Sequence, residues 1–174
     1  MIRNASKLLL IFSVLTSPVA TAKDASTKAR SHENPLVGTW RLVRYADTLE
    51  GGKTIHAFGE APIGQFIFTK DGHISVHIMH NPPAPTNAPV DPDPDACMPS
   101  WYCAYFGSYT FNAKDNSWVT RVKGGNIVSY VGTDQKRSFS IKGDQLIISE
   151  KYKSADGVQV TAERVLVRAG ATPK

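Results

Sequence analysis

The chain lacks a hydrophobic run long enough to cross a membrane as a helix. Its most apolar stretch, from Leu8 to Leu15, has eight residues, whereas a spanning helix needs roughly 20. Basic Arg3 and Lys7 flank its start, and the small residues Ala20-Thr21-Ala22 follow it. This order is typical of a secretory signal peptide. We therefore expect residues 1–22 to be cleaved, and the mature protein to be secreted or periplasmic with no stable membrane span.

A block of basic residues is also missing. The formal net charge is +5, and two of these positive charges, Arg3 and Lys7, belong to the predicted signal peptide. The small excess that remains is typical of an ordinary solvated surface. No stripe of Lys and Arg suits a phosphate backbone, so nucleic acid is not an expected partner.

Catalytic and metal-binding motifs are absent as well. The chain has no Gly-x-Ser-x-Gly elbow and no glycine-rich phosphate loop. His73 and His77 fall on one face of a predicted strand, where the strand rise separates them by roughly 13 Å, too far to share one metal ion. We therefore expect no catalytic residue, no metal and no cofactor.

Cysteine is scarce, with only Cys97 and Cys103. After export, a disulfide between them is chemically permissible, and it would close a short loop. Two free thiols are the alternative. Cys97 lies at the end of a Pro-rich segment, 81–100, which holds seven of the eleven prolines. Because proline cannot donate to a sheet ladder, this segment is expected to be a long loop between strands.

Most of the remaining sequence consists of short runs rich in β-branched and aromatic residues. No stretch shows a sustained apolar stripe with the helical period of 3.6 residues. Asp71-Gly72, Gly143-Asp144 and Asp156-Gly157 separate consecutive runs, as in β-hairpins. The runs predicted to be strands are 39–45, 54–58, 64–69, 73–79, 101–111, 118–122, 127–131, 136–141, 145–150 and 158–167.

This pattern predicts an all-β protein, an antiparallel up-and-down β-barrel of about 8–10 strands. The expected organisation is a signal peptide at 1–22, a flexible linker at 23–35, one barrel at 36–168 and a C-terminal tail at 169–174. An eight-stranded barrel has an interior that holds side chains or one small ligand.

Several ordered motifs resemble the bacterial and fungal lipocalin-like domain family. Gly38-Thr39-Trp40 is similar to the lipocalin Gly-x-Trp signature, and the similarity extends over about 36–168. The family tends to carry an aromatic residue where this chain has Ala162. The resemblance implies a small lipocalin-type barrel and no particular reaction. The other motifs that carry it lie at 58–64, 68–76, 104–110, 132–137, 143–146 and 163–165.

The Trp of the first motif is expected to be structural. Trp40 is predicted to close the barrel floor, with a basic side chain from the last strand stacked over its ring. Arg164 is the candidate for that side chain.

Alternation along 135–141 predicts an unusual interior residue. Lys136, Ser138 and Ser140 form the solvent face, so Gln135, Arg137 and Phe139 should point inward. A guanidinium inside a barrel needs a partner. That partner is either a protein group, such as Glu150, Glu163, Tyr105 or Tyr109, or the polar end of a ligand. The candidate ligand-binding residues are Arg137, Gln135, Tyr105, Tyr109, His77 and Phe139, with Phe66 and Phe68 as further apolar wall candidates.

Three functions follow as hypotheses. The first is an exported carrier of a small hydrophobic or amphipathic molecule, as a monomer or a dimer. The second is an isomerase or cyclase that uses the same cavity, with His77 moving a proton. The third is an interaction or inhibitor module that acts through the Pro-rich loop 81–100.

Overall fold

The structure is a computed structural model, and it describes residues 33–83 and 101–170. The predicted signal peptide, residues 23–32 of the predicted linker and residues 171–174 of the predicted tail lie outside the described residues. The same holds for 84–100, which includes most of the Pro-rich loop.

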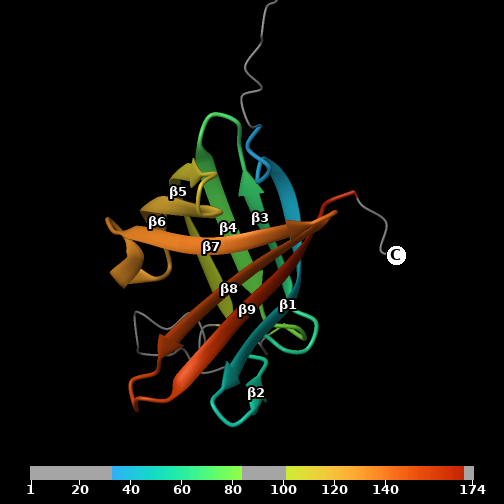
Figure 1. The fold of residues 1–174 in the computed structure, drawn as a ribbon, viewed down its shortest axis with the longest axis vertical. Coiled ribbons are helices and arrows are strands. Elements are labelled where there is room, and N and C mark those ends of the chain that lie inside the picture. The colour runs from blue at the N-terminus through green and yellow to red at the C-terminus, as the bar shows by residue number, and fades with distance from the viewer. Residues whose placement is uncertain (1–32, 84–100, 171–174) are drawn as a thin grey trace, which may run out of the picture. The chain divides into compact units, whose positions relative to one another are not determined.

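Nine strands and one short 3-10 helix form the described part of the chain (Figure 1). Every pairing between neighbouring strands is antiparallel. In chain order the elements are β1 (Gly38–Leu49), β2 (Thr54–Ile55), β3 (Ile63–Phe68), β4 (His73–Met79), β5 (Tyr102–Asn112), β6 (Ser117–Gly125), η1 (Val128–Tyr130), β7 (Asp134–Lys142), β8 (Gln145–Lys153) and β9 (Gln159–Arg168).

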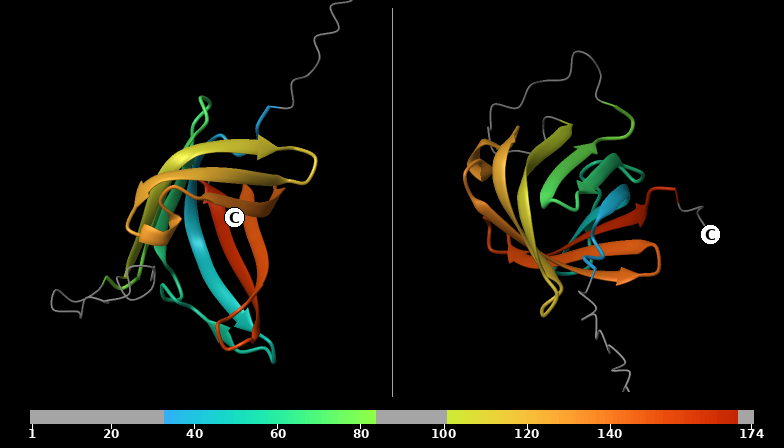
Figure 2. Two further views of the ribbon diagram at one scale, coloured as in Figure 1. Left: turned by 90° about the vertical axis from the view of Figure 1, so that its left-hand side faces the viewer. Right: turned by 90° about the horizontal axis from the view of Figure 1, so that it is seen from above.

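Pairing of the first strand with the last closes the sheet into a barrel. The strands from β3 to β9 follow one another in sequence order, and β1 pairs with both β3 and β9. Figure 2 shows β1, in cyan, beside β9, in red. The short β2 pairs only with the far end of β1, at Asp47 and Thr48. Eight strands therefore form the closed wall, which confirms the predicted up-and-down barrel.

The hairpin predicted at Asp71-Gly72 joins β3 to β4. Phe68 pairs with Ile74 across the turn, and Gly72 has a φ of +87°. A positive φ suits glycine because it has no Cβ. The turn sets the register that places Phe66, Phe68, Ile74 and Val76 in the core.

One predicted strand is wrong. Residues 127–131 form η1 and its flanks instead, with the amide of Tyr130 donating to the carbonyl of Ile127 at 3.1 Å. The reason is topological, because β6 and β7 pair directly with each other and the segment between them only connects the two strands. The connection brings the Tyr130 side chain to the barrel interior.

The end of the predicted linker belongs to the fold. The Asn34 side-chain amide donates to the Tyr109 hydroxyl at 2.8 Å, and the Asn34 side-chain oxygen accepts from the Leu36 amide at 3.1 Å. Leu36 is fully buried in the hydrophobic core. The packed part of the barrel therefore begins at about residue 34, two residues before the start predicted at 36.

Candidate functional site

One end of the barrel interior is closed by packing around Trp40. The Trp40 ring is fully buried, and its Nε1 donates to the carbonyl of Leu36 at 2.7 Å. Arg168 covers the ring with its guanidinium 4.1 Å from the ring centroid. The same guanidinium donates to the carbonyls of Val37 and Pro35, each at 3.0 Å. These contacts tie the segment before β1 across the floor of the barrel.

The prediction that Arg164 stacks on Trp40 is therefore wrong. In an antiparallel pair the beginning of one strand faces the end of the other, and Trp40 pairs with Arg168. Arg164 pairs with Tyr45 further along β1, and its guanidinium lies 3.3 Å from the centroid of the Tyr45 ring.

Tyr109 and Phe139 lie in the closed end. Tyr109 packs edge-on against Phe68 at 5.2 Å between ring centroids, and its hydroxyl donates to the carbonyl of Thr69 at 3.0 Å. Phe139 packs against Trp118 at 5.7 Å. Both side chains point inward, as their strand positions predicted, but neither lines the open cavity. Phe68 also packs in the closed end, against Tyr109 and Trp118. Phe66 lines the open cavity.

The other part of the interior contains a cavity of about 470 Å³. It combines apolar walls with a cluster of phenols, guanidiniums and carboxylates. Its lining residues are Tyr45, Asp47, Phe66, Val76, Ile78, Cys103, Tyr105, Ile127, Tyr130, Gln135, Arg137, Ile148, Glu150, Tyr152, Ala162 and Arg164.

The interior guanidinium of Arg137 has protein partners. Its Nε lies 3.4 Å from Glu150 Oε1, and one terminal nitrogen donates to the carbonyl of Lys136 at 2.7 Å. The other terminal nitrogen makes only long contacts, at 3.5 Å with the Tyr130 hydroxyl and 3.4 Å with Gln135 Oε1. Of the partners considered from the sequence, Glu150 is the one that forms an ion pair, whereas Glu163 pairs with Arg44.

Arg137 remains charged in this setting. Burial by itself disfavours the charge, but the nearby Tyr105, Glu150 and Tyr130 outweigh burial and raise the pKa of Arg137 above its ordinary value. For Tyr105 burial dominates, and it raises the pKa of the phenol to about 12. Tyr105 is thus a neutral phenol at physiological pH, facing a permanent cation.

A second guanidinium, that of Arg164 on β9, also lines the cavity. Arg164 donates to Asp47 Oδ1 at 2.7 Å and to the carbonyl of Ala46 at 2.9 Å, while its plane stacks on Tyr45. Tyr45 also packs edge-on against Phe58, with 4.7 Å between centroids. Burial raises the pKa of the Tyr45 phenol despite the neighbouring Arg164. These contacts hold Arg164 firmly in one position.

Tyr45, Asp47, Tyr130 and Tyr152 were missed from the sequence. Tyr130 lies in a segment that was predicted to be a strand but forms η1. Strand alternation therefore could not give the direction of its side chain. Tyr45 and Asp47 follow a register shift in β1 between Leu42 and Arg44, which reverses the alternation that begins at Trp40. Such β-bulges leave little trace in a single sequence.

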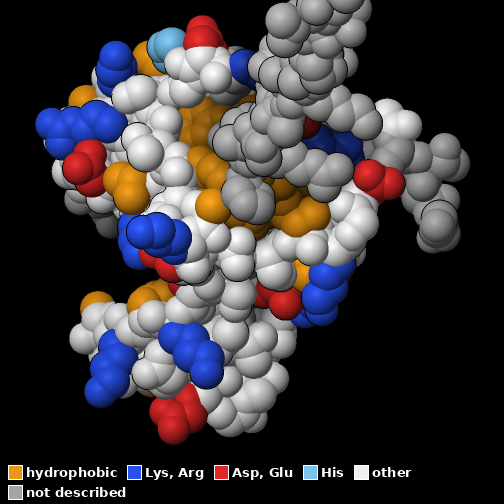
Figure 3. All heavy atoms as spheres, turned by 45° about the horizontal axis from the view of Figure 1, so that its top comes forward, with side chains coloured by type: hydrophobic (Ala, Val, Ile, Leu, Met, Phe, Trp, Pro, Cys, Tyr) orange, Lys and Arg blue, Asp and Glu red, His pale blue; other side chains and the backbone are white. Residues whose placement is uncertain are grey.

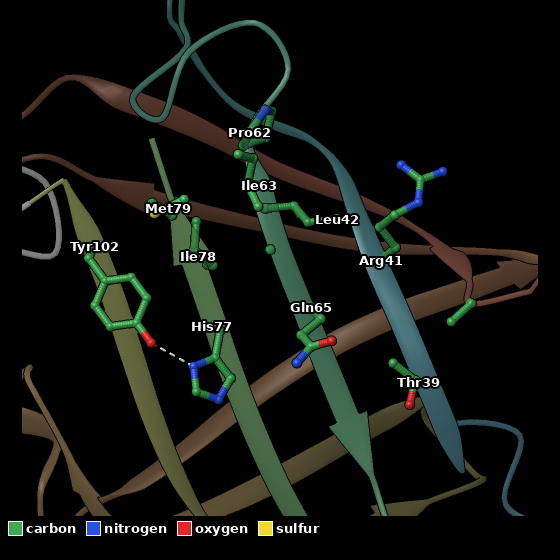
Figure 4. A pocket seen from close by; sticks show the side chains of 12 residues that line it. Thr39, Arg41, Leu42, Pro62, Ile63, Gln65, His77, Ile78, Met79 and Tyr102 are labelled. Atoms are coloured by element: carbon green, nitrogen blue, oxygen red, sulfur yellow. Dashed lines mark hydrogen bonds between the residues drawn. The ribbon is translucent and has the colours of Figure 1, made fainter. Parts of the chain in front are cut away.

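His77 does not line the interior. In β4 the core residues are Ile74, Val76 and Ile78, so His77 points outward. It lines a separate groove of about 600 Å³ across β1, β3, β4 and β5 (Figure 4). The prediction of His77 as a ligand contact inside the barrel is therefore wrong, and an enzyme that used it as the base inside the cavity is not supported.

The outward face holds a short hydrogen-bonded chain. His77 Nε2 lies 2.8 Å from Ser75 Oγ. His77 Nδ1 lies 2.7 Å from the Tyr102 hydroxyl (Figure 4). The spacing is similar to that of a nucleophile and its base. However, Ser75 pairs with both Ile67 and Phe106 in the middle of a three-stranded ladder. The backbone amides there are engaged in the sheet, so they do not form an oxyanion hole.

The disulfide stays a prediction. Cys103 is buried on β5 and lines the cavity, whereas Cys97 lies outside the described residues. Within residues 33–83 and 101–170, no group of three His, Cys, Asp or Glu side chains is arranged to hold a metal ion. Nor does the described part of the chain contain a helix both long and apolar enough to span a membrane.

Charges on the surface are mixed. On the face in Figure 3, Lys and Arg side chains are interspersed with Asp and Glu. Exposed pairs such as Arg121 with Asp134 and Lys136 with Asp115 contribute to this pattern.

A closed eight-stranded barrel with a partly polar interior cavity defines a class of proteins, the β-barrels suited to binding one small molecule. The chain belongs to the lipocalin-like domain family, whose model matches residues 37–168. The match covers the whole barrel from the start of β1 to the end of β9. No curated protein matches the sequence.

Proposed function

We propose that this protein is an exported carrier that binds one small amphipathic molecule in the barrel cavity. The observation that carries the proposal is the cavity of about 470 Å³, which falls within the usual range of about 300–1,000 Å³ for small-molecule sites. Phe66, Val76, Ile78 and Ile148 supply apolar walls, and Arg137 supplies a charged donor beside them. Export rests on the signal-like pattern of residues 1–22.

Arg137 is the polar contact that the proposal assigns to the ligand. Its Lys136 and Glu150 contacts occupy one terminal nitrogen and Nε, and the second terminal nitrogen has only long contacts at 3.4 and 3.5 Å. A guanidinium has five N–H donors. The hydroxyl or carbonyl oxygen of a ligand would therefore accept from Arg137 while its apolar part lay against the walls.

Binding is testable on the mature protein purified without detergent. A neutral fluorescent naphthylamine is titrated into the protein and then displaced with dodecanol. We expect one saturable site. Arg137→Ala should weaken dodecanol binding about tenfold, the size of one lost hydrogen bond to a charged group.

Arg121→Ala is the matched control, because Arg121 forms an exposed pair with Asp134 on the outside of the barrel. It should leave affinity unchanged. Probe fluorescence that never saturates, together with an empty barrel in native mass spectrometry, would overturn the proposal. Equal losses from the two variants would remove Arg137 from the site.

A further inference from the structure

The charges inside the cavity balance. Among the lining residues that the structure describes, Asp47, Arg137, Glu150 and Arg164 are the ones with charged side chains, two of each sign. Each guanidinium is paired with one carboxylate, Arg137 with Glu150 and Arg164 with Asp47. A ligand therefore enters an interior that has no uncompensated positive charge.

We infer that the cavity selects uncharged amphiphiles, such as alcohols and esters, over carboxylates, and that Glu150 is the residue that enforces this selection. The inference rests on the proposed function and specifies its ligand class. It assigns Glu150 a role in specificity that is separate from holding the barrel together.

The charge of Arg164 is already compensated by Asp47. Its contact with Asp47 is short, at 2.7 Å, and the two side chains are only 15% and 17% exposed. One face of its guanidinium lies on Tyr45, and the terminal nitrogen that contacts Asp47 also donates to the carbonyls of Ala46 and Glu163. A ligand anion at Arg164 would therefore lie beside the carboxylate of Asp47, and like charges at this distance repel.

The Arg137 pair is looser than the Arg164 pair and more exposed, so it is the more accessible of the two to a ligand. The distance from Arg137 Nε to Glu150 Oε1 is 3.4 Å, and the side chains are 21% and 34% exposed. A neutral oxygen can accept from the second terminal nitrogen of Arg137 while Glu150 keeps its position. A carboxylate would meet the negative charge of Glu150 in a partly desolvated site, where like charges are costly.

The experiment compares two ligands with one chain length, dodecanol and dodecanoate, in displacement of the neutral naphthylamine. The wild-type protein should bind dodecanol at least about tenfold more tightly than dodecanoate. Glu150→Gln keeps an acceptor for Arg137 and removes the negative charge. This variant should bind dodecanoate about tenfold more tightly than the wild type does, so that the preference for dodecanol over dodecanoate is lost.

Glu163→Gln is the matched control. Glu163 forms the same kind of pair with Arg44, at 2.9 Å on the outer face, so the substitution makes the same change in net charge outside the cavity. It should leave both affinities unchanged. Displacement of the probe from the wild type by methyl dodecanoate tests the selectivity without any variant. This ester has the acyl chain of dodecanoate but no charge, and it should bind as tightly as dodecanol.

The outcomes separate the two proposals. If the probe does not bind to the wild type at all, the proposed function fails. If the probe binds but the wild type takes dodecanoate as tightly as dodecanol and its methyl ester, the selectivity is overturned and the carrier function stands. An equal gain in dodecanoate affinity for Glu150→Gln and Glu163→Gln would overturn the role of Glu150.

Discussion

Tyr105 shows how burial in this cavity changes the chemistry of a single residue. Its side chain lies on the inward face of β5, and it lines the same cavity as Arg137. Burial favours the neutral phenol and raises its pKa to about 12. A neutral phenol beside a charged guanidinium presents a hydrogen-bonding surface without adding a charge, which fits the balanced interior.

The raised pKa of Tyr105 predicts a loss of stability at alkaline pH. Between pH 10 and 12 the unfolded chain ionises this tyrosine while the folded protein keeps it protonated, so the unfolded state binds fewer protons and stability falls as pH rises. The full effect is on the order of 2 to 3 kcal/mol. Tyr105→Phe should lose less stability across this window, measured by urea unfolding at a series of pH values. Parallel curves for the two proteins would contradict the prediction.

The direction of a side chain was predictable from the sequence on some strands and not on others. Alternation along β7 placed Gln135 and Arg137 inside, because that strand pairs with β6 and β8 with no register shift. The partner of Trp40 required the pairing of β1 with β9, which connects the two ends of the barrel sequence. No local pattern distinguishes Arg164 from Arg168, since both lie on the inward face of β9.

At the level of elements, the bulges determine which residues the cavity receives. The shift in β1 turns Tyr45 and Asp47 inward and Arg44 outward, where Arg44 pairs with Glu163. A second shift lies in the pairing of β5 with β6, where Lys123 of β6 is the extra residue opposite Phe106 and Gly107. The number and order of strands were predictable from turns and alternation, whereas the bulges depend on contacts between strands far apart in the sequence.

Gly107 is required by the close approach of β6. A Cβ at this position would lie 2.0 Å from the carbonyl oxygen of Arg121, a backbone atom that cannot move without opening the pair. Gly107→Ala should therefore destabilise the protein by about 2 to 3 kcal/mol. The midpoint of urea or thermal unfolding measures this loss.

Gly124→Ala provides the control on the paired strand. Its Cβ would meet the ring of Phe106 at 2.8 Å, but that ring is 54% exposed and has room to turn away. We expect a change of less than about 1 kcal/mol. Comparable losses from both substitutions would show that backbone crowding is not what requires Gly107.

At the scale of the whole barrel, the interior divides into a packed end and an open part. Trp40, Phe68, Tyr109, Trp118 and Phe139 fill the first with aromatic contacts. In the second, the small side chain of Ala162 contributes to the open space. The fold was predictable because period-two patterning extends through most of the chain. The division was not, because it depends on side-chain volumes that meet from opposite walls.

Ala162 gives the most direct test that this space is the binding site. It lies on β9 between Asp47 of β1 and Glu150 of β8, with which it pairs, and it lines the cavity. Ala162→Phe should place a ring in the cavity and weaken dodecanol binding at least about tenfold. Shorter alcohols should lose less affinity, because they need less of the remaining volume. Thr161→Phe adds the same ring at the neighbouring position, whose side chain points away from the interior, and should leave binding unchanged. Equal affinities for the two variants would place the ligand outside the barrel.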